Sequence, residues 1–288
     1  MPKSSRWERW GGRSLILAIA LYAFGVVGFP LLALLRAAWL QPADDLRTLL
    51  TQELAIEAFK LSLTASVGAA IFNTFLGLLL AWILVRYQFP GKRLADALID
   101  LPFAMSGVVA GIALFSLYGP NGTIAQIWAP ETPLGRLLTQ VGIEDFNFTA
   151  SQLGVIFAMV YVTLPFVVRT VQPVLAELEP ELEEVAATLG ATPSQTFWRV
   201  LFPQLIPALV TGFSLALARG LGEYGLVTII SGNIPYKTLV ATVYVYQRFE
   251  EFDISGATAV SLVLLVVSLL LLAITNSLGL WFRLSHKY

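Results

Sequence analysis

The sequence has no cysteine and a single histidine, and these absences exclude several kinds of chemistry. Without cysteine the chain forms no disulfide, no thiolate metal site and no cysteine nucleophile. The histidine is His286, close to the C-terminus, and we expect it to be a solvated tail residue. A histidine-based catalytic triad is therefore excluded.

Charged residues are also scarce. They make up 13% of the chain, against 57% hydrophobic residues and a mean hydropathy of +0.74. A soluble domain of 288 residues needs more charge to cover its surface, so the composition indicates a membrane protein. The net charge of −1 gives no basis for nucleic-acid binding.

Long apolar runs predict six transmembrane helices in one domain covering residues 1–288. A bilayer core of about 30 Å requires about 20 apolar residues per helix. The predicted spans are 15–35, 61–84, 99–118, 153–168, 205–230 and 257–281. No ten-residue alternation suggests a barrel, so the predicted fold class is an all-α membrane protein. The first run continues to Leu35, well past a nominal cleavage site, which favours an uncleaved span.

The distribution of Lys and Arg predicts the orientation of these spans. With the N-terminus inside, 11 of the 18 basic residues fall in inner segments, six in outer segments, and Arg219 falls within a span. The positive-inside rule then predicts that both termini are cytoplasmic. It also predicts a cytoplasmic position for residues 180–204, between the fourth and fifth spans.

Residues 180–204 interrupt the apolar pattern with acidic residues, a glycine and prolines. Pro180 suits a first helical turn, and Glu181, Glu183 and Glu184 favour the positive end of a helix dipole. Leu182, Val185, Ala186 and Leu189 share one face, and Gly190 is typical of a helix end.

A second short helix is predicted directly after Gly190. Thr192-Pro193-Ser194-Gln195 has the pattern of a capping box with proline at the first helical position. This helix is expected to expose Phe197, Trp198 and Leu201 and to end before Pro203. The two helices form either a linker on the membrane surface or a docking site for another protein.

The chain lacks the elements of a nucleotide site. The phosphate-loop pattern G-x-x-x-x-G-K-[ST] is absent, so we expect no ATP binding by this chain. The sequence GLGEYG at 220–225 matches G-x-G-x-x-G, but it follows an apolar span and not a strand. A dinucleotide site is therefore rejected.

Arg219 and Glu223 are four residues apart within the fifth predicted span, so they share a helix face and form a pair. Charges inside a membrane are costly, and they mark either a structural pair or a transport pathway. Both interpretations remain open. Ser106, Thr211, Ser214, Arg219 and Glu223 are the candidate lining residues of an anion path. No metal site is predicted.

The run Glu184-Val185-Ala186, three residues, Gly190, nine residues, then Val200-x-Phe202-Pro203 resembles the EAA loop of bacterial ABC importer permeases. The departures from that pattern at Val185, Val200 and Phe202 are apolar exchanges. The resemblance implies that this loop is a coupling helix that docks into a cytoplasmic ATPase subunit. It implies coupling roles for Glu183, Glu184, Ala186, Gly190, Phe197, Trp198 and Pro203.

Longer segments resemble the sulfate/molybdate branch of these permeases. They are residues 86–104, 164–191, 218–225 and 231–238. Residues 169–192 and the run FEEFD at 249–253 are most similar to T-type subunits of sulfate/thiosulfate permeases, whereas MSGVVAG at 105–111 is nearer the W-type partner.

The resemblance implies a complex in the bacterial inner membrane. This chain and a W-type sister permease would sit on two copies of an ABC ATPase, which would carry ATP and magnesium. A periplasmic or tethered binding protein would deliver sulfate or thiosulfate to outer loops near 118–151 and 231–253. This chain itself would be a transport subunit and not an enzyme.

Three alternatives remain. A molybdate/tungstate permease shares the GEYG-like motif. A secondary transporter or channel would show inverted repeats or a selectivity filter, and neither is visible. A membrane-embedded enzyme would require a cluster of catalytic side chains within the spans, and none is visible.

Overall fold

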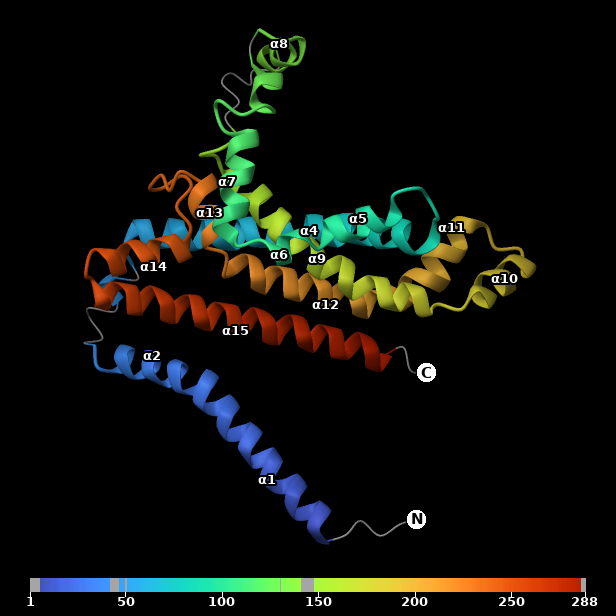
Figure 1. The fold of residues 1–288 in the computed structure, drawn as a ribbon, viewed down its shortest axis with the longest axis horizontal. Coiled ribbons are helices and arrows are strands. Elements are labelled where there is room, and N and C mark those ends of the chain that lie inside the picture. The colour runs from blue at the N-terminus through green and yellow to red at the C-terminus, as the bar shows by residue number, and fades with distance from the viewer. Residues whose placement is uncertain (1–5, 42–46, 50, 130, 141–147, 286–288) are drawn as a thin grey trace.

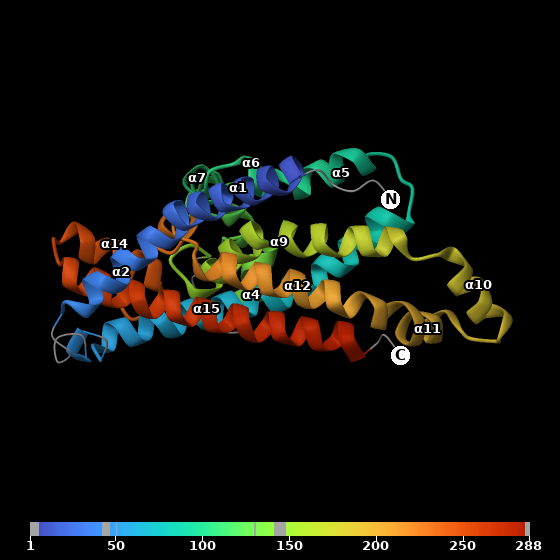
Figure 2. The same cartoon turned by 90° about the horizontal axis from the view of Figure 1, so that it is seen from below.

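The computed structural model describes residues 6–41, 47–49, 51–129, 131–140 and 148–285, and this part contains helices and no strand. The prediction of an all-helical fold is confirmed. Four long helices, α4, α9, α12 and α15, form a bundle and run lengthwise in both views (Figures 1 and 2). Their bounds are Glu53–Arg86, Gln152–Glu177, Phe202–Leu221 and Ile254–Ser285.

Small residues let the three central helices approach closely. A Cβ atom on Gly77 of α4 would lie 2.7 Å from the side chain of Val167 on α9, and one on Gly212 of α12 would lie 3.0 Å from the Val167 Cα. Val167 is fully buried between these two glycines. The buried alanines Ala70 and Ala81 lie on the same side of α4 as Gly77. Close backbone approach of this kind is typical of helix packing in membranes.

A buried polar contact also joins α4 to α9. Asn73 Nδ2 donates to the Val160 carbonyl over 2.9 Å and to Thr163 Oγ1 over 2.8 Å. Thr163 in turn donates to the Met159 carbonyl. Because Asn73 is fully buried, its two donated bonds fix the register of the helix pair.

The first predicted span lies in a segment that diverges from the bundle. Helices α1 (Arg6–Ala23) and α2 (Phe29–Trp39) are joined by a π-helical turn, η1 (Phe24–Gly28). In Figure 1, α1 extends away from the other helices, while α2 contacts α15. The apolar stretch Leu15–Trp39 is long enough to cross a membrane.

The third predicted span, 99–118, is wrong as a single helix. The chain instead forms α5 (Lys92–Ile99), α6 (Leu101–Ala104) and α7 (Gly107–Tyr118). Pro102 stands at the start of α6, and Met105 and Ser106 are extended, so the helix is interrupted twice. The 12 residues of α7 span about 18 Å, which is too short for a bilayer core.

Beyond this break the chain leaves the bundle. Helix α7 projects steeply from the long helices and leads to a 3₁₀ turn, η2 (Ala125–Trp128), and to α8 (Pro133–Gln140) (Figure 1). At its base α7 packs on α13 (Gly225–Ile230). A Cβ on Gly111 would lie 2.9 Å from Ile229, so glycine is required for this contact.

The fifth predicted span, 205–230, is also interrupted. A continuous helical run begins at Pro193 and α12 ends at Leu221. Residues 222–224 then break the helix before α13. Glu223 Oε1 accepts a hydrogen bond from the Leu226 N–H over 2.8 Å, which caps the new helix.

The remaining predicted spans, 15–35, 61–84, 153–168 and 257–281, lie within longer helical runs in the structure. In the described part of the chain, five helices are long and apolar enough to cross a membrane, at Leu15–Trp39, Glu53–Arg86, Gln152–Glu177, Pro193–Leu221 and Ile254–Thr275. Helix α9 continues past the predicted end at 168, although Pro165 and Pro173 lie within it.

Short helices mark the two ends of the bundle. Helices α10 (Pro180–Thr188) and α11 (Pro193–Thr196) lie at one end, and α14 (Ala241–Glu250) lies at the other (Figures 1 and 2). Arg248 secures α14 to the start of α4, donating to Gln52 Oε1 over 3.0 Å and to Tyr244 Oη over 2.7 Å.

Candidate coupling loop and ion-pair site

Helix α10 ends in a left-handed glycine, as the sequence predicted. Gly190 has φ of +82°, its N–H donates to the Ala187 carbonyl, and the Ala191 N–H donates to the Ala186 carbonyl. These two bonds form a Schellman motif. A Cβ at Gly190 would meet no atom within 4 Å, so the backbone angle, and not space, requires glycine.

The capping box at the start of α11 is confirmed. The Gln195 N–H donates to Thr192 Oγ1 over 3.3 Å, and the Thr192 N–H donates to Gln195 Oε1 over 2.8 Å. Pro193 occupies the first turn. Two short helices therefore meet at a bend of defined geometry.

Aromatic side chains join this bend to the bundle. Phe197, in the π-helical turn η3 (Phe197–Leu201), packs edge-on against Trp82 of α4 with ring centroids 5.3 Å apart. Trp198 packs against Phe202 at 4.8 Å. The prediction that Leu201 is exposed is wrong, because η3 continues directly into α12 and directs Leu201 into the core.

Arg86 connects the end of α4 to α10. Its Nη2 lies 2.7 Å from Glu183 Oε1, although neither atom forms an aligned hydrogen bond. The guanidinium also lies over the Trp82 ring, 5.3 Å from its centroid. Sequence reasoning missed Arg86. The structure therefore places Glu183 in a contact within the chain, whereas Glu184 is exposed.

The outward surface of the loop is apolar. Val185, Leu189 and Trp198 are 59%, 82% and 59% exposed, whereas Ala186 is buried against the rest of the loop. Pro203 lies half-buried in the first turn of α12. Of the predicted coupling residues, Glu184, Gly190 and Trp198 lie on the surface, and Ala186, Glu183, Phe197 and Pro203 connect the loop to the chain.

Arg219 and Glu223 form the predicted pair. Arg219 Nη1 lies 2.5 Å from Glu223 Oε2. Glu223 is buried, and its second carboxylate oxygen caps α13, while its carbonyl accepts a hydrogen bond from Thr242. The Arg219 side chain is 38% exposed. The carboxylate is thus held from two sides, and the guanidinium reaches the surface of this chain.

The other candidate path residues are only partly gathered around this pair. Ser106 caps α7 by accepting from the Val109 N–H, and a Cβ on the adjacent Gly107 would lie 2.9 Å from Glu223 Oε1. Ser106 is therefore near the pair. Thr211 lies eight residues before Arg219 on α12, about 12 Å along the helix. Its hydroxyl donates to the Pro207 carbonyl, and the buried Ser214 donates to the Val210 carbonyl.

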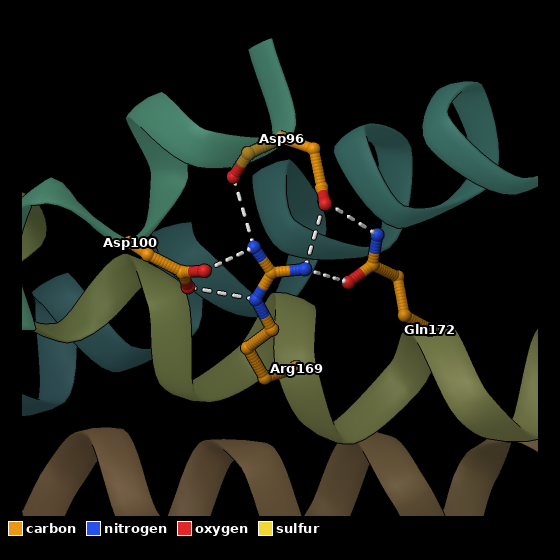
Figure 3. A network of polar contacts seen from close by, with 4 residues as sticks. All are labelled: Asp96, Asp100, Arg169 and Gln172. Carbon is orange, nitrogen blue, oxygen red and sulfur yellow. Dashed lines mark hydrogen bonds and ion pairs between the residues drawn. The ribbon is translucent and has the colours of Figure 1, made fainter. Parts of the chain in front are cut away.

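A second charged cluster, around Arg169, was not predicted (Figure 3). From α9, Arg169 donates to both oxygens of Asp100 over 2.7 and 2.6 Å, to Asp96 Oδ1 over 2.8 Å and to the Asp96 carbonyl over 2.8 Å. It also donates to Gln172 Oε1. All five guanidinium N–H groups therefore have an acceptor.

The cluster attaches α5 to α9. Hydrogen bonds from Gln172 and Arg169 lower the pKa of the Asp96 carboxyl below its usual value. The Asp100 side chain forms no cap on α6 and instead binds Arg169. The i, i+4 spacing of Asp96 and Asp100 was the available signal. Among the described residues, no group of three or more acidic or histidine side chains could hold a metal ion.

Comparison with known families identifies the fold. The family described as binding-protein-dependent transport system inner membrane component matches residues 73–283. The chain belongs to this family. The match covers every helix from the second half of α4 onward, and it includes both the loop at α10–α11 and the Arg219–Glu223 pair. Members of this family are transport subunits and not enzymes.

Curated relatives are named as one type of permease. The sulfate transport system permease protein CysT of Synechocystis is 42% identical over 97% of this chain and 93% of its own length. CysT of Salmonella typhimurium is 44% identical over 92% of this chain and 87% of its own length. The probable sulfate permease CysT of Nephroselmis olivacea is 45% identical over 90% of this chain and 85% of its own length. The predicted T-type resemblance is confirmed.

Solved structures share the fold. A bacterial alginate ABC transporter in complex with an alginate-bound periplasmic protein has a chain that matches with a TM-score of 0.74 at 20% identity, over 94% of both chains. A chain of the MetNI methionine ABC transporter matches with a TM-score of 0.58 at 17% identity, over 80% of this chain and 96% of that one.

Proposed function

We propose that this chain is the transmembrane permease subunit of an ATP-driven importer of sulfate and thiosulfate. The observation that carries the proposal is that curated relatives covering most of the chain are named sulfate transport permeases. The loop at α10–α11 supports the ATP-driven part. It is a bent, outward-facing apolar surface, of the kind that a second protein would cover.

Such a transporter requires a source of energy. Moving a dianion into a cell against the membrane potential costs about 4.6 kcal/mol per 100 mV, twice the cost for one charge. A passive channel would lose sulfate under those conditions. Hydrolysis of ATP and magnesium chemistry would reside in a separate ATPase, because this chain has no phosphate loop.

In this proposal the loop docks on the ATPase. Val185, Leu189 and Trp198 would supply the apolar contact and Glu184 a polar one, while Gly190 sets the bend between the helices. Glu183, Ala186, Phe197 and Pro203 would transmit force to α4 and α12 through Arg86 and Trp82. Two ATPase copies would serve this chain and its sister permease.

A second permease subunit would complete the anion path. Arg219 is half-exposed at the surface of this chain, beside Ser106, so a path lined by it needs a facing wall. A W-type sister is the proposed source of that wall, and a periplasmic or tethered binding protein would deliver the anion. The complex would lie in the bacterial inner membrane, with both termini and α10–α11 in the cytoplasm. In Figures 1 and 2, α1 begins and α15 ends toward the end of the bundle where α10 and α11 lie, which supports this orientation.

Uptake of radiolabelled sulfate and molybdate tests the function. Cells lacking their own sulfate permease would receive this chain with its presumed partners. We expect ATP-dependent sulfate uptake that excess thiosulfate suppresses and excess molybdate leaves nearly unchanged. Molybdate uptake with little sulfate transport would instead assign the chain to a molybdate/tungstate importer, and uptake independent of ATP would contradict the proposal.

A further inference from the structure

The arginines of the long helices α4, α9 and α12 differ in what they can still bind. All five N–H groups of Arg169 have acceptors within the chain. The Nε and Nη2 atoms of Arg86 are buried next to Glu183. The Arg219 side chain is half-exposed, and among the described contacts only its Nη1 has a partner, Glu223. Of these three guanidinium groups, that of Arg219 is therefore the one with donors left for an anion from outside the chain.

The Glu223 carboxylate is fixed independently of Arg219. Its Oε1 accepts a hydrogen bond from the Leu226 N–H over 2.8 Å, and the main-chain carbonyl of Glu223 accepts one from the Thr242 hydroxyl over 2.7 Å. Gly107 of α7 closes over the same carboxylate oxygen, because a Cβ there would lie 2.9 Å from it. An anion that approached Arg219 would therefore find this buried carboxylate still in place beside the guanidinium.

A neutral donor also lies beside the pair. Ser106 precedes Gly107, and its oxygen accepts a hydrogen bond from the Val109 N–H over 3.3 Å. The Ser106 O–H itself has no acceptor among the described residues, and the residue is exposed. Since a hydroxyl can donate one hydrogen bond while it accepts others, Ser106 can assist Arg219 in binding an anion without adding charge.

Two opposing interactions would act on a dianion bound at this position. The free Nε and Nη2 groups of Arg219 would attract it through charge-assisted hydrogen bonds, whereas the fixed Glu223 carboxylate would repel it. A transport pathway must bind an ion well enough to admit it and weakly enough to release it. A guanidinium without a counter-charge would hold a dianion too tightly for rapid release.

We propose that Glu223 is a fixed counter-charge that limits how tightly Arg219 holds the transported oxyanion. Arg219 would contact the anion, with Ser106 as a neutral donor, and Glu223 would act only through Arg219. The inference rests on the proposed function, which supplies a tetrahedral dianion as the cargo. It gives the Glu223 carboxylate a second role besides capping α13: the carboxylate lowers affinity and thereby speeds release.

Equilibrium dialysis of radiolabelled sulfate against the purified complex, without its binding protein, tests this role together with ATP-driven uptake into proteoliposomes. Glu223→Gln keeps an oxygen for the Leu226 N–H but removes the charge. We expect this variant to bind sulfate about tenfold more tightly than wild type and to import it more slowly at saturating substrate. Glu57→Gln is the matched control, because Glu57 is also paired with a basic residue at helical spacing, Lys60, and it should change neither quantity.

A double variant separates this role from a structural one. In Arg219→Gln/Glu223→Gln the gain in affinity should vanish, because Glu223 acts through Arg219. A merely destabilised protein would bind sulfate less well, so tighter binding is not a consequence of damage to the fold. Unchanged or weaker binding by Glu223→Gln, or a gain that persists without Arg219, would overturn the inference.

A second substitution covers the case in which Glu223→Gln does not fold. Ser106→Lys offsets the carboxylate from an exposed neighbouring position and should also tighten sulfate binding and slow import, and unchanged binding would equally overturn the inference. Wild-type uptake is measured in the same proteoliposomes. Sulfate import by wild type without tighter binding in the variants refutes this inference alone, whereas an absence of wild-type sulfate import refutes the proposed function.

Discussion

In the coupling loop, formed by α10 and α11, Gly190 is the residue whose backbone conformation requires glycine. Its φ of +82° lies in the region that costs other residues about 1–2 kcal/mol, yet the space around it is open. The sequence alone predicted this glycine correctly, because a helix end followed by a capping box is a local pattern. Glu183 was predicted less well, because its partner Arg86 is distant in sequence.

Replacing Gly190 tests whether the bend matters. Gly190→Ala should lower stability by about 1 kcal/mol and reduce co-purification of the ATPase, because the helix end can no longer adopt its angle without strain. Gly68→Ala is the matched control, since Gly68 on α4 also has no atom within 4 Å of a Cβ. It should be neutral or stabilising. Thermal unfolding and pull-down of the ATPase measure both effects, and equal behaviour of the two variants would refute the argument.

The Arg219–Glu223 pair gives a second residue-scale prediction. Glu223→Ala removes both the partner of Arg219 and the cap on α13, so we expect a loss of about 2 kcal/mol. Glu223→Gln keeps an oxygen for the Leu226 N–H and should be less destabilised. Thermal unfolding in detergent compares them. An alanine variant as stable as the glutamine variant would show that capping contributes nothing.

Among the individual helices, α5 is held to the bundle by the ion pairs of Arg169 with Asp96 and Asp100. It packs on its neighbours α6 and α9, and Arg169 supplies its main polar attachment. Sequence reasoning missed this attachment because Arg169 lies about 70 residues from both carboxylates, and the i, i+4 spacing of Asp96 and Asp100 does not identify a partner that distant. It also joined α6 and α7 into one span, 99–118, since hydropathy does not register the extended backbone at Met105 and Ser106.

Arg169→Lys should loosen α5, because an ammonium group has three donors and cannot reproduce a bidentate contact with Asp100 while binding Asp96. We expect amide exchange in residues 92–104 to accelerate at least tenfold. Arg93→Ala, an exposed basic residue on the same helix, is the control and should leave exchange unchanged. Unaltered exchange in Arg169→Lys would mean that apolar contacts alone hold α5.

The lowered pKa of Asp96 sets the sign of a pH effect. The folded state holds this carboxyl ionised more strongly than the unfolded state does, so its contribution to stability is complete above about pH 4 and is lost as the pH falls through the folded pKa. Thermal unfolding at pH 7 and pH 3.5 should therefore show a smaller loss for Asp96→Asn than for wild type. An identical loss would show that other carboxyls account for the acid sensitivity.

At the scale of the whole molecule, hydropathy predicted the bundle and charge counts predicted its orientation. The four lengthwise helices coincide with predicted spans because each must present apolar surface along its full length. The projecting α7 could not be predicted, because its apolar residues look the same whether lipid, α13 or another chain covers them.

The absence of cysteine makes the orientation directly testable. Ser194→Cys in α11 and Thr123→Cys beyond α7 each introduce one exposed thiol. With α11 in the cytoplasm, a membrane-impermeant thiol reagent should label Thr123→Cys in cells whose outer membrane is permeable, and Ser194→Cys only after lysis. Labelling in the reverse order would invert the topology.

The position of Val167 between Gly77 and Gly212 has a mechanical consequence. At that point a glycine of α4 and a glycine of α12 both lie against Val167 of α9. If one helix slid past another, a larger side chain would replace a glycine at this contact and clash with Val167. We therefore expect helices α4, α9 and α12 to move as one rigid unit around this contact. Displacement of α10–α11 at one end of this unit is then accompanied by displacement of the Arg219 end of α12.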